Sequence, residues 1–144
     1  MEGKTSKKYK EELFIMTALK QFNRALEKLP TRLKELKKLI TQQDWKKEEI
    51  NQAISILESL EEGDWFDSIP YASIQFTRVA LYFSPSECGV NNKFFNSKNI
   101  LKACEYTRGL LEKINEISKY IQFTLDGWAL EDEEMCIFYI RWEI

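Results

Sequence analysis

The sequence predicts an α+β fold in which a long N-terminal helical hairpin is followed by one strand, a further long helix and a C-terminal antiparallel β-meander of about three to four strands. Two observations support this prediction. Apolar residues recur at steps of three or four over residues 8–62 and again from residue 97, which is the period of one helical face. Residues 73–83 and 119–144 are instead rich in β-branched and aromatic residues, which favour strands.

The composition fits one domain spanning residues 1–144. The chain has 144 residues, 44% of them hydrophobic, so it is long enough to bury a core of its own. Residues 1–7 are polar and are expected to fray. No stretch is apolar enough to span a membrane, and the first residues lack the apolar segment of a signal peptide. We therefore expect a cytoplasmic protein with no membrane partner.

The sequence contains no histidine, which narrows the chemistry open to it. Serine–histidine and cysteine–histidine nucleophile pairs and most zinc sites are excluded, since no other unperturbed side chain titrates near neutral pH. The P-loop, GxGxxG and GxSxG motifs do not occur either. Cys88, Cys104 and Cys136 lack CxxC spacing and are interpreted as reduced, half-buried thiols. We predict that the protein is not an enzyme and uses no metal or cofactor.

The first helical segment carries one continuous apolar stripe, formed by Ile15, Ala18, Phe22, Ala25, Leu29, Leu33, Leu36 and Ile40. The stripe keeps its phase across Pro30. A proline removes a backbone donor, so the segment is either one kinked helix or two collinear helices, and the preserved phase favours the kinked helix. This helix is about twice as long as the next one, so its first half must pack against the later helix, the sheet or a second copy of the chain. The overhang allows a homodimer.

The second helix is predicted over residues 45–62, with Asp44 as its N-cap and Gly63 at its end. Its apolar stripe consists of Ile50, Ala53, Ile54, Leu57 and Leu60. The short connection implies an antiparallel hairpin in which this stripe packs on residues 33–40.

Residues 64–72 form a predicted loop, and residues 73–83 form a predicted strand. The alternation in this strand changes phase near Thr77 and Arg78, which indicates a β-bulge or burial of both faces. A helix is the alternative, because short apolar runs do not distinguish the two. Residues 84–96 are then expected to form a long loop, and loops of this length are often used for binding.

The third helix is predicted to have Ser97 as its N-cap. Its apolar stripe consists of Ile100, Ala103, Cys104, Thr107, Leu111, Ile114, Ile117 and Ile121. Gly109 lies inside this helix at a cost of about 1 kcal/mol relative to alanine, which suggests close packing at that position.

The C-terminal stretch is predicted to form two successive hairpins. The pair Asp126-Gly127 indicates a two-residue turn. The strands on either side would share one apolar face, made of Phe123, Leu125, Trp128 and Leu130. The acidic residues 131–134 form the second turn, before a strand over residues 135–144. Both faces of this last strand are apolar, so it is either a central strand with both faces covered or a surface on which something else binds.

Charge is unevenly distributed along the chain. Residues 1–47 hold 13 Lys and Arg against 6 Asp and Glu, whereas residues 48–144 hold 8 against 17. This asymmetry predicts either a charged partner or an internal match between the two parts. The candidate basic patch consists of Lys34, Lys37, Lys38, Lys46 and Lys47. Nucleic acid would bind there in the first alternative hypothesis, although a solvated helix face is the commoner role of such residues.

The candidate acidic patch lies at the end of the second helix and consists of Glu58, Glu61, Glu62, Asp64 and Asp67. A carboxylate at a helix C-terminus is unfavourable by about 0.3–1 kcal/mol, so a neighbouring basic surface would explain the cluster. The second alternative hypothesis is an enzyme that depends on four of these carboxylates, Glu58, Glu62, Asp64 and Asp67. Their spacing does not by itself indicate a metal site.

The chain has more aromatic residues than one core face would hide, and we interpret some of them as a protein-binding patch. The candidate interface consists of Phe138, Ile140, Trp142, Phe94, Phe95 and Trp65. The leading hypothesis is a small non-enzymatic protein that binds another protein, as an inhibitor of the immunity, antitoxin or phage counter-defence type does. The sequence does not identify that partner.

Overall fold

The computed structural model of the chain describes residues 2–61 and 76–143, and the side chains in these ranges apart from those of residues 2–6, 22, 26, 76 and 77. The elements are helices α1 (Glu2–Thr41) and α2 (Lys47–Glu61), strand β1 (Phe76–Phe83), the 3-10 helix η1 (Ser86–Cys88), helix α3 (Ser97–Ile117), and strands β2 (Gln122–Leu130) and β3 (Cys136–Glu143). The predicted α+β class is confirmed.

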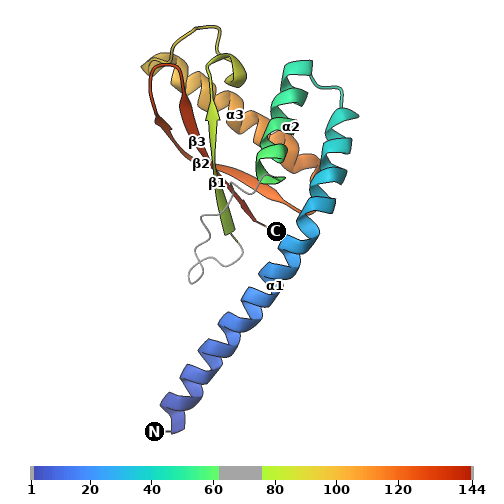
Figure 1. Cartoon of the computed structure of the whole chain (residues 1–144), viewed down its shortest axis with the longest axis vertical. Coiled ribbons are helices and arrows are strands. Elements are labelled where there is room, and N and C mark those ends of the chain that lie inside the picture. The colour runs from blue at the N-terminus through green and yellow to red at the C-terminus, as the bar shows by residue number, and fades with distance from the viewer. Residues whose placement is uncertain (1, 62–75, 144) are drawn as a thin grey trace.

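The three strands form an antiparallel sheet in the order β1-β3-β2, so the C-terminal strand lies at its centre. Helix α3 packs against β2, while α2 packs against β1 and against the second half of α1 (Figure 1). The core lies between the sheet and these helices and includes Leu57, Leu111 and Phe138. Arg78 and Tyr82 alternate with the buried residues of β1, so their exposed side chains lie on the other face of the sheet. We call this two-layer part of the molecule the body.

Helix α1 is continuous through Pro30, as the phase of its apolar stripe predicted. Leu29 and Leu33 on either side of the proline are buried, whereas Pro30 is exposed. Packing of the stripe on α2 therefore holds the backbone helical across a residue that lacks a hydrogen-bond donor. The helix also includes residues 2–7, which the sequence led us to expect outside it.

Two predicted helix starts need correction. Helix α2 begins at Lys47, so Asp44 lies too early in the chain to cap it. The N-cap of α3 is Asn96 rather than Ser97. The Oδ1 atom of Asn96 accepts from the backbone N–H of Asn99 at 2.9 Å, and the Asn99 side chain accepts from the backbone N–H of Asn96 at 2.6 Å. This reciprocal pair makes asparagine the stronger cap at this position.

The Asp126-Gly127 pair does not form a turn, so the first predicted hairpin is wrong. Strand β2 runs through the pair and remains bonded to β3, with Asp126 as an extra residue between Leu125 and Gly127. A one-residue bulge shifts the alternation of side chains in the same way as a two-residue turn does. The predicted shared face therefore survives, because its members lie opposite the inward residues of β3: Phe123, Leu125, Trp128 and Leu130.

The remaining strand predictions have mixed outcomes. The acidic residues 131–134 do form the hairpin turn that joins β2 to β3. Residues 76–83 form a strand and not a helix, and their register with β3 is unbroken, so the bulge predicted near Thr77 and Arg78 is absent from these residues. The alternative, burial of both faces, is also wrong, because Arg78 and Tyr82 are exposed. Residues 73–75 lie outside the described residues. Gly109 has no atom within 4 Å of an added Cβ, so the predicted close packing there is wrong.

Candidate protein-interaction surface

The first half of α1 leaves the body as an exposed helix (Figure 1). We call residues 7–28 of this helix the arm. Leu29 is the first described side chain of α1 that is buried, with 2% of its surface exposed. On the arm, Phe14 is 71% exposed, Met16 is 57% exposed and Leu13 is 51% exposed. Large apolar side chains therefore face solvent along the arm.

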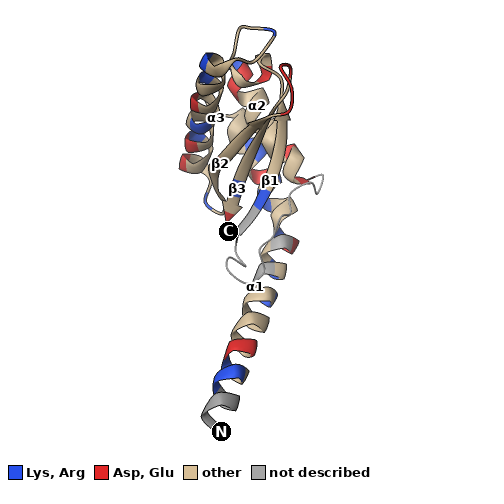
Figure 2. Ribbon diagram, turned by 90° about the vertical axis from the view of Figure 1, so that its left-hand side faces the viewer, with Lys and Arg blue, Asp and Glu red and all other residues tan. Residues whose placement is uncertain are grey.

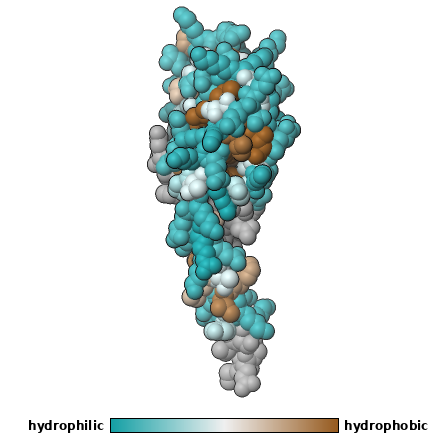
Figure 3. All heavy atoms as spheres, turned by 90° about the vertical axis from the view of Figure 1, so that its right-hand side faces the viewer, coloured by the Kyte–Doolittle hydropathy of each residue, from teal (hydrophilic) through white to brown (hydrophobic). Residues whose placement is uncertain are grey.

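These apolar residues do not lie on one side of the helix. Residues 13–16 are Leu, Phe, Ile and Met, and each residue of an α-helix turns by about 100° from the one before, so four in a row point to all sides. A surface helix normally has one apolar stripe, and a helix that is apolar all round is normally buried. Figure 3 shows apolar side chains among hydrophilic ones along the arm. Its composition at residues 13–16 is that of a buried helix.

Charged residues flank the apolar run on both sides (Figure 2). All nine of the charged side chains on the arm are exposed: Lys7, Lys8, Lys10, Glu11, Glu12, Lys20, Arg24, Glu27 and Lys28. The cations outnumber the carboxylates by six to three. The arm therefore presents apolar area together with a net positive charge.

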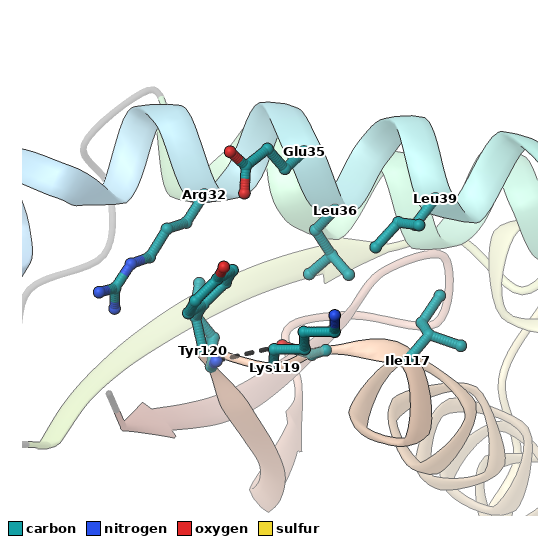
Figure 4. Close-up of a pocket in the computed structure, with 9 residues that line it drawn as sticks. Arg32, Glu35, Leu36, Leu39, Ile117, Lys119 and Tyr120 are labelled. Carbon is teal, nitrogen blue, oxygen red and sulfur yellow. Dashed lines mark hydrogen bonds between the residues drawn. The ribbon is translucent and has the colours of Figure 1, made fainter.

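A hollow lies where the arm joins the body (Figure 4). Its walls are formed by the last residue of α3, Ile117, by residues 118–121 between α3 and β2, and by four residues of α1: Arg32, Glu35, Leu36 and Leu39. The guanidinium carbon of Arg32 lies 4.6 Å from the centroid of the Tyr120 ring, which is a cation–π contact. The hollow lies on the body, beside the C-terminal end of the arm.

Most of the predicted aromatic interface belongs to the core instead. Phe138, Ile140 and Trp142 are each 0% exposed, and Phe95 is also buried. The reason is the position of β3 as the central strand, because β1 and β2 pair along its two edges and the helices pack on its inward face. These residues do not form a binding surface in this structure. Trp65 lies outside the described residues.

Phe94 is the one described member of the predicted interface that is exposed, at 49%. It lines an open hollow between the loop of residues 84–96 and the turn that follows β2. The backbone N–H of Phe95 donates to the carbonyl of Glu133 at 2.7 Å, and the Asn99 side chain donates to the carbonyl of Phe94 at 2.8 Å. These bonds anchor the loop to the turn and to α3.

The residues of the two predicted charged patches differ in exposure and in their contacts. Lys34, Lys38, Lys46 and Lys47 are exposed, but Lys37 is half-buried and forms an ion pair with Glu61. Nucleic-acid binding by these lysines remains a prediction. Glu58 is exposed, whereas Glu62, Asp64 and Asp67 lie outside the described residues, so the carboxylate-dependent enzyme also remains a prediction.

The three cysteines are buried and unpaired in disulfides, rather than half-buried. Burial raises the pKa of Cys88 to about 12, and the nearby Cys136 adds to the shift. Burial likewise raises the pKa of Cys136 to about 11. The thiols are therefore protonated and unreactive at neutral pH. Among residues 2–61 and 76–143, no three His, Cys, Asp or Glu side chains are placed to hold a metal ion.

The exposed apolar residues of the arm were not predicted. The single predicted stripe contains Ile15, and its described residues are buried only from Leu29 onwards. A signal was present, because the uninterrupted run at residues 13–16 is wider than one stripe requires. The length of the first helix was a second signal, because it exceeds that of α2, but the sequence does not show whether the later helix or the sheet covers the excess. In the structure neither of them covers the arm.

Comparisons with known proteins do not assign a function to this surface. No protein-family model, curated protein or solved structure matches the chain. Within the part of the chain that the structure describes, no helix is long and apolar enough to cross a membrane.

Proposed function

We propose that this protein is a non-enzymatic protein-binding protein and that the arm is the element that binds. The observation that supports the proposal is the exposure of Leu13, Phe14 and Met16 on a helix that leaves the body. Full burial of one such side chain contributes about 1.5–3 kcal/mol. A groove that covers several of them would supply much of the free energy of a specific complex. Helices commonly bind proteins in this way, by placing apolar residues in a groove.

The charges on the arm favour a protein over a lipid surface or a nucleic acid. Glu11 and Glu12 directly precede the apolar run. An anionic membrane or a phosphate backbone would repel these carboxylates. A protein surface has both signs of charge, so it would accommodate the carboxylates and also pair with Lys8 and Arg24.

Within this class we favour an inhibitor that blocks the surface of its partner. Blocking requires a docking element and no catalytic group. The arm is such an element, since it projects beyond the body and carries apolar side chains.

The proposal is tested by capture from an extract of the source cells with the purified full chain as bait. Phe14→Asp should abolish capture, because it places a charge in the apolar run. Leu101→Asp is the matched control, because Leu101 is 59% exposed but lies on α3. The Leu101→Asp variant should capture the same proteins as the original chain. Both variants should keep the original free energy of unfolding to within about 0.5 kcal/mol.

Two outcomes contradict the proposal. In the first, the bait with Phe14→Asp captures the same proteins as the bait with Leu101→Asp. In the second, the original chain captures no protein but sediments with anionic lipid vesicles, and Phe14→Asp prevents this sedimentation.

A further inference from the structure

The arm has an apolar face that is in line with the buried stripe of α1. Each residue of an α-helix turns by about 100° from the one before. Measured from the centre of the buried stripe at residues 29–40, Ile15 and Ala18 lie about 30° to either side, and Ala25 lies about 50° away. We call this face of residues 14–28 the seam. The stripe that packs in the body therefore continues along the arm.

The charged residues at positions 14–28 lie away from the seam. They are at least about 110° from its centre: Lys20, Arg24, Glu27 and Lys28. The exposed Leu13 and Met16 also lie outside it, at about 170° and 130°. A helix that is apolar on one side and charged on the other normally packs by its apolar side. Among the described residues, α2 covers the stripe at residues 29–40 and no element covers the seam.

The spacing along the seam is typical of a pair of helices. Positions 15, 18, 22, 25 and 29 hold Ile, Ala, Phe, Ala and Leu, at alternating steps of three and four residues. This heptad repeat keeps one face of a helix against a second helix that lies alongside it. Helix α2 already packs on the later part of the same stripe. A partner that continues this packing along the arm is therefore also a helix.

A second copy of the chain does not fit against the seam. In a parallel pair of arms, both bodies would lie at the same end, and the two α2 helices would collide because each is on the side that faces the other copy. In an antiparallel pair centred on the seam, the first turns of each arm would collide with α2 of the other copy. A shift that avoids this collision would place Lys8 and Glu11, about 50° and 10° from the centre of the seam, against apolar residues of the other copy. The partner is therefore a different protein.

The charges beside the seam favour an acidic partner. Lys10 and Lys28 are exposed and lie on the same side of the arm, about 110° from the centre of the seam. In a pair of helices, charged residues that flank the contact pair with opposite charges on the other helix. Over the whole arm the cations outnumber the carboxylates by six to three. Carboxylates on the partner helix would therefore be attracted to the arm.

We propose that the seam binds an acidic amphipathic helix of another protein, which continues along α1 from the place where α2 ends. This inference rests on the proposed function, since it states which face of the arm binds and what chemistry its partner has. From Phe14 to Lys28 the seam rises by about 21 Å, so the partner helix has about four turns in contact with it.

The first test measures binding of the purified full chain to two synthetic peptides by fluorescence anisotropy. Both peptides carry leucine at the a and d positions of successive heptads. One carries glutamate at the e and g positions, and the other carries lysine there. At low salt the glutamate peptide should bind more tightly by about tenfold or more, and high salt should reduce the difference. The inference is overturned if the glutamate peptide does not bind, or if the two peptides bind equally.

The second test locates the contact on the arm with two neighbouring residues. Ala18→Glu places a carboxylate in the seam, whereas Thr17→Glu places one about 130° from its centre. Ala18→Glu should weaken binding of the glutamate peptide by about tenfold or more, and Thr17→Glu should change it by less than about twofold. Both variants should unfold at the same temperature as the original chain, because both residues lie outside the body. Equal effects of the two substitutions overturn the inference.

Light scattering of the purified chain tests the alternative occupant. The chain should be a monomer in the absence of peptide. A dimer that Ala18→Glu dissociates would make a second copy the occupant of the seam, and it would overturn the inference.

The two proposals fail separately. If the glutamate peptide does not bind but Phe14→Asp abolishes capture from the cell extract, the acidic helix is wrong and the proposed function stands. If Phe14→Asp leaves capture unchanged, the proposed function is wrong, and the inference that rests on it is overturned as well.

Discussion

The Nζ atom of Lys37 lies 2.7 Å from the Oε2 atom of Glu61, and this ion pair joins the second half of α1 to the last turn of α2. A second pair, between Lys113 and Glu49 at 2.6 Å, joins α3 to the first turn of α2. Both carboxylates belong to α2, while the cations come from the helices on either side. The Lys37–Glu61 pair therefore matches part of the charge asymmetry between residues 1–47 and 48–144, whereas both residues of the second pair belong to the acidic part.

The Lys37–Glu61 pair should contribute modestly to stability. Both side chains are partly exposed, so solvent screens their attraction. A double-mutant cycle with Lys37→Ala and Glu61→Ala should give a coupling free energy of about 0.2–1 kcal/mol, measured by urea unfolding at low salt. The coupling should shrink in high salt. An absence of coupling at low salt would show that the ion pair does not contribute to the free energy of unfolding.

Two glycines should respond in opposite directions to alanine. Gly109→Ala should stabilise the protein by about 0.4–1 kcal/mol, because α3 has open space at that position and alanine favours a helix. Gly89→Ala should destabilise it by more than about 1 kcal/mol, because Gly89 has a φ of +77° and an added Cβ would lie 2.8 Å from Cδ2 of Tyr106. Both predictions are checked by measuring the free energy of unfolding of each variant. A destabilising Gly109→Ala would mean that α3 is packed at this point after all.

The buried thiols predict a loss of stability at alkaline pH. The pKa of Cys88 rises from its ordinary value of 9.0 to about 12 in the folded protein. Between these values the unfolded chain loses the thiol proton while the folded chain retains it, so the free energy of unfolding falls as pH rises from about 9 to about 12. The slope should decrease in Cys88→Ala. An unchanged slope would show that this thiol ionises equally easily in both states.

An aromatic residue of the core and one of the arm should differ sharply in their effect on folding. Trp142→Ala should cost about 3–5 kcal/mol, because Trp142 is fully buried at the centre of the sheet. Phe14→Ala should change the free energy of unfolding by less than about 0.5 kcal/mol, because Phe14 lies outside the body. The free energies of unfolding of the two variants, measured by chemical unfolding, make the comparison. A large cost of Phe14→Ala would place the arm inside the fold.

The order of elements could be predicted from the sequence because each helix and strand has its own apolar period. The β2 bulge could not be predicted as such. A turn at Asp126-Gly127 and an extra residue at Asp126 shift the alternation of side chains equally, so the pattern of Phe123 and Trp128 is the same in both. Only the pairing partner distinguishes them. Strand β3 is long enough to pair with both parts of β2, and this pairing makes one continuous strand.

The candidate surface was harder to predict than the fold. The sequence shows that Trp142 is apolar and that Phe14 is apolar, but it does not show which of them the other elements cover. The central position of β3 buries Trp142, and the position of α2 beside residues 29–41 leaves Phe14 uncovered. Burial depends on contacts between segments that are distant in sequence, and local sequence patterns do not reveal these contacts.

The most direct measurement is photo-crosslinking from the arm, with a photoreactive phenylalanine analogue placed at position 14 and, as the control, at position 101. Position 14 should form a covalent adduct with a protein, whose mass distinguishes a second copy of the chain from another partner. Position 101, which is exposed on α3, should form little or none. Equal adduct yields from the two positions, or no adduct from position 14, would contradict the account of the arm as a protein-binding surface.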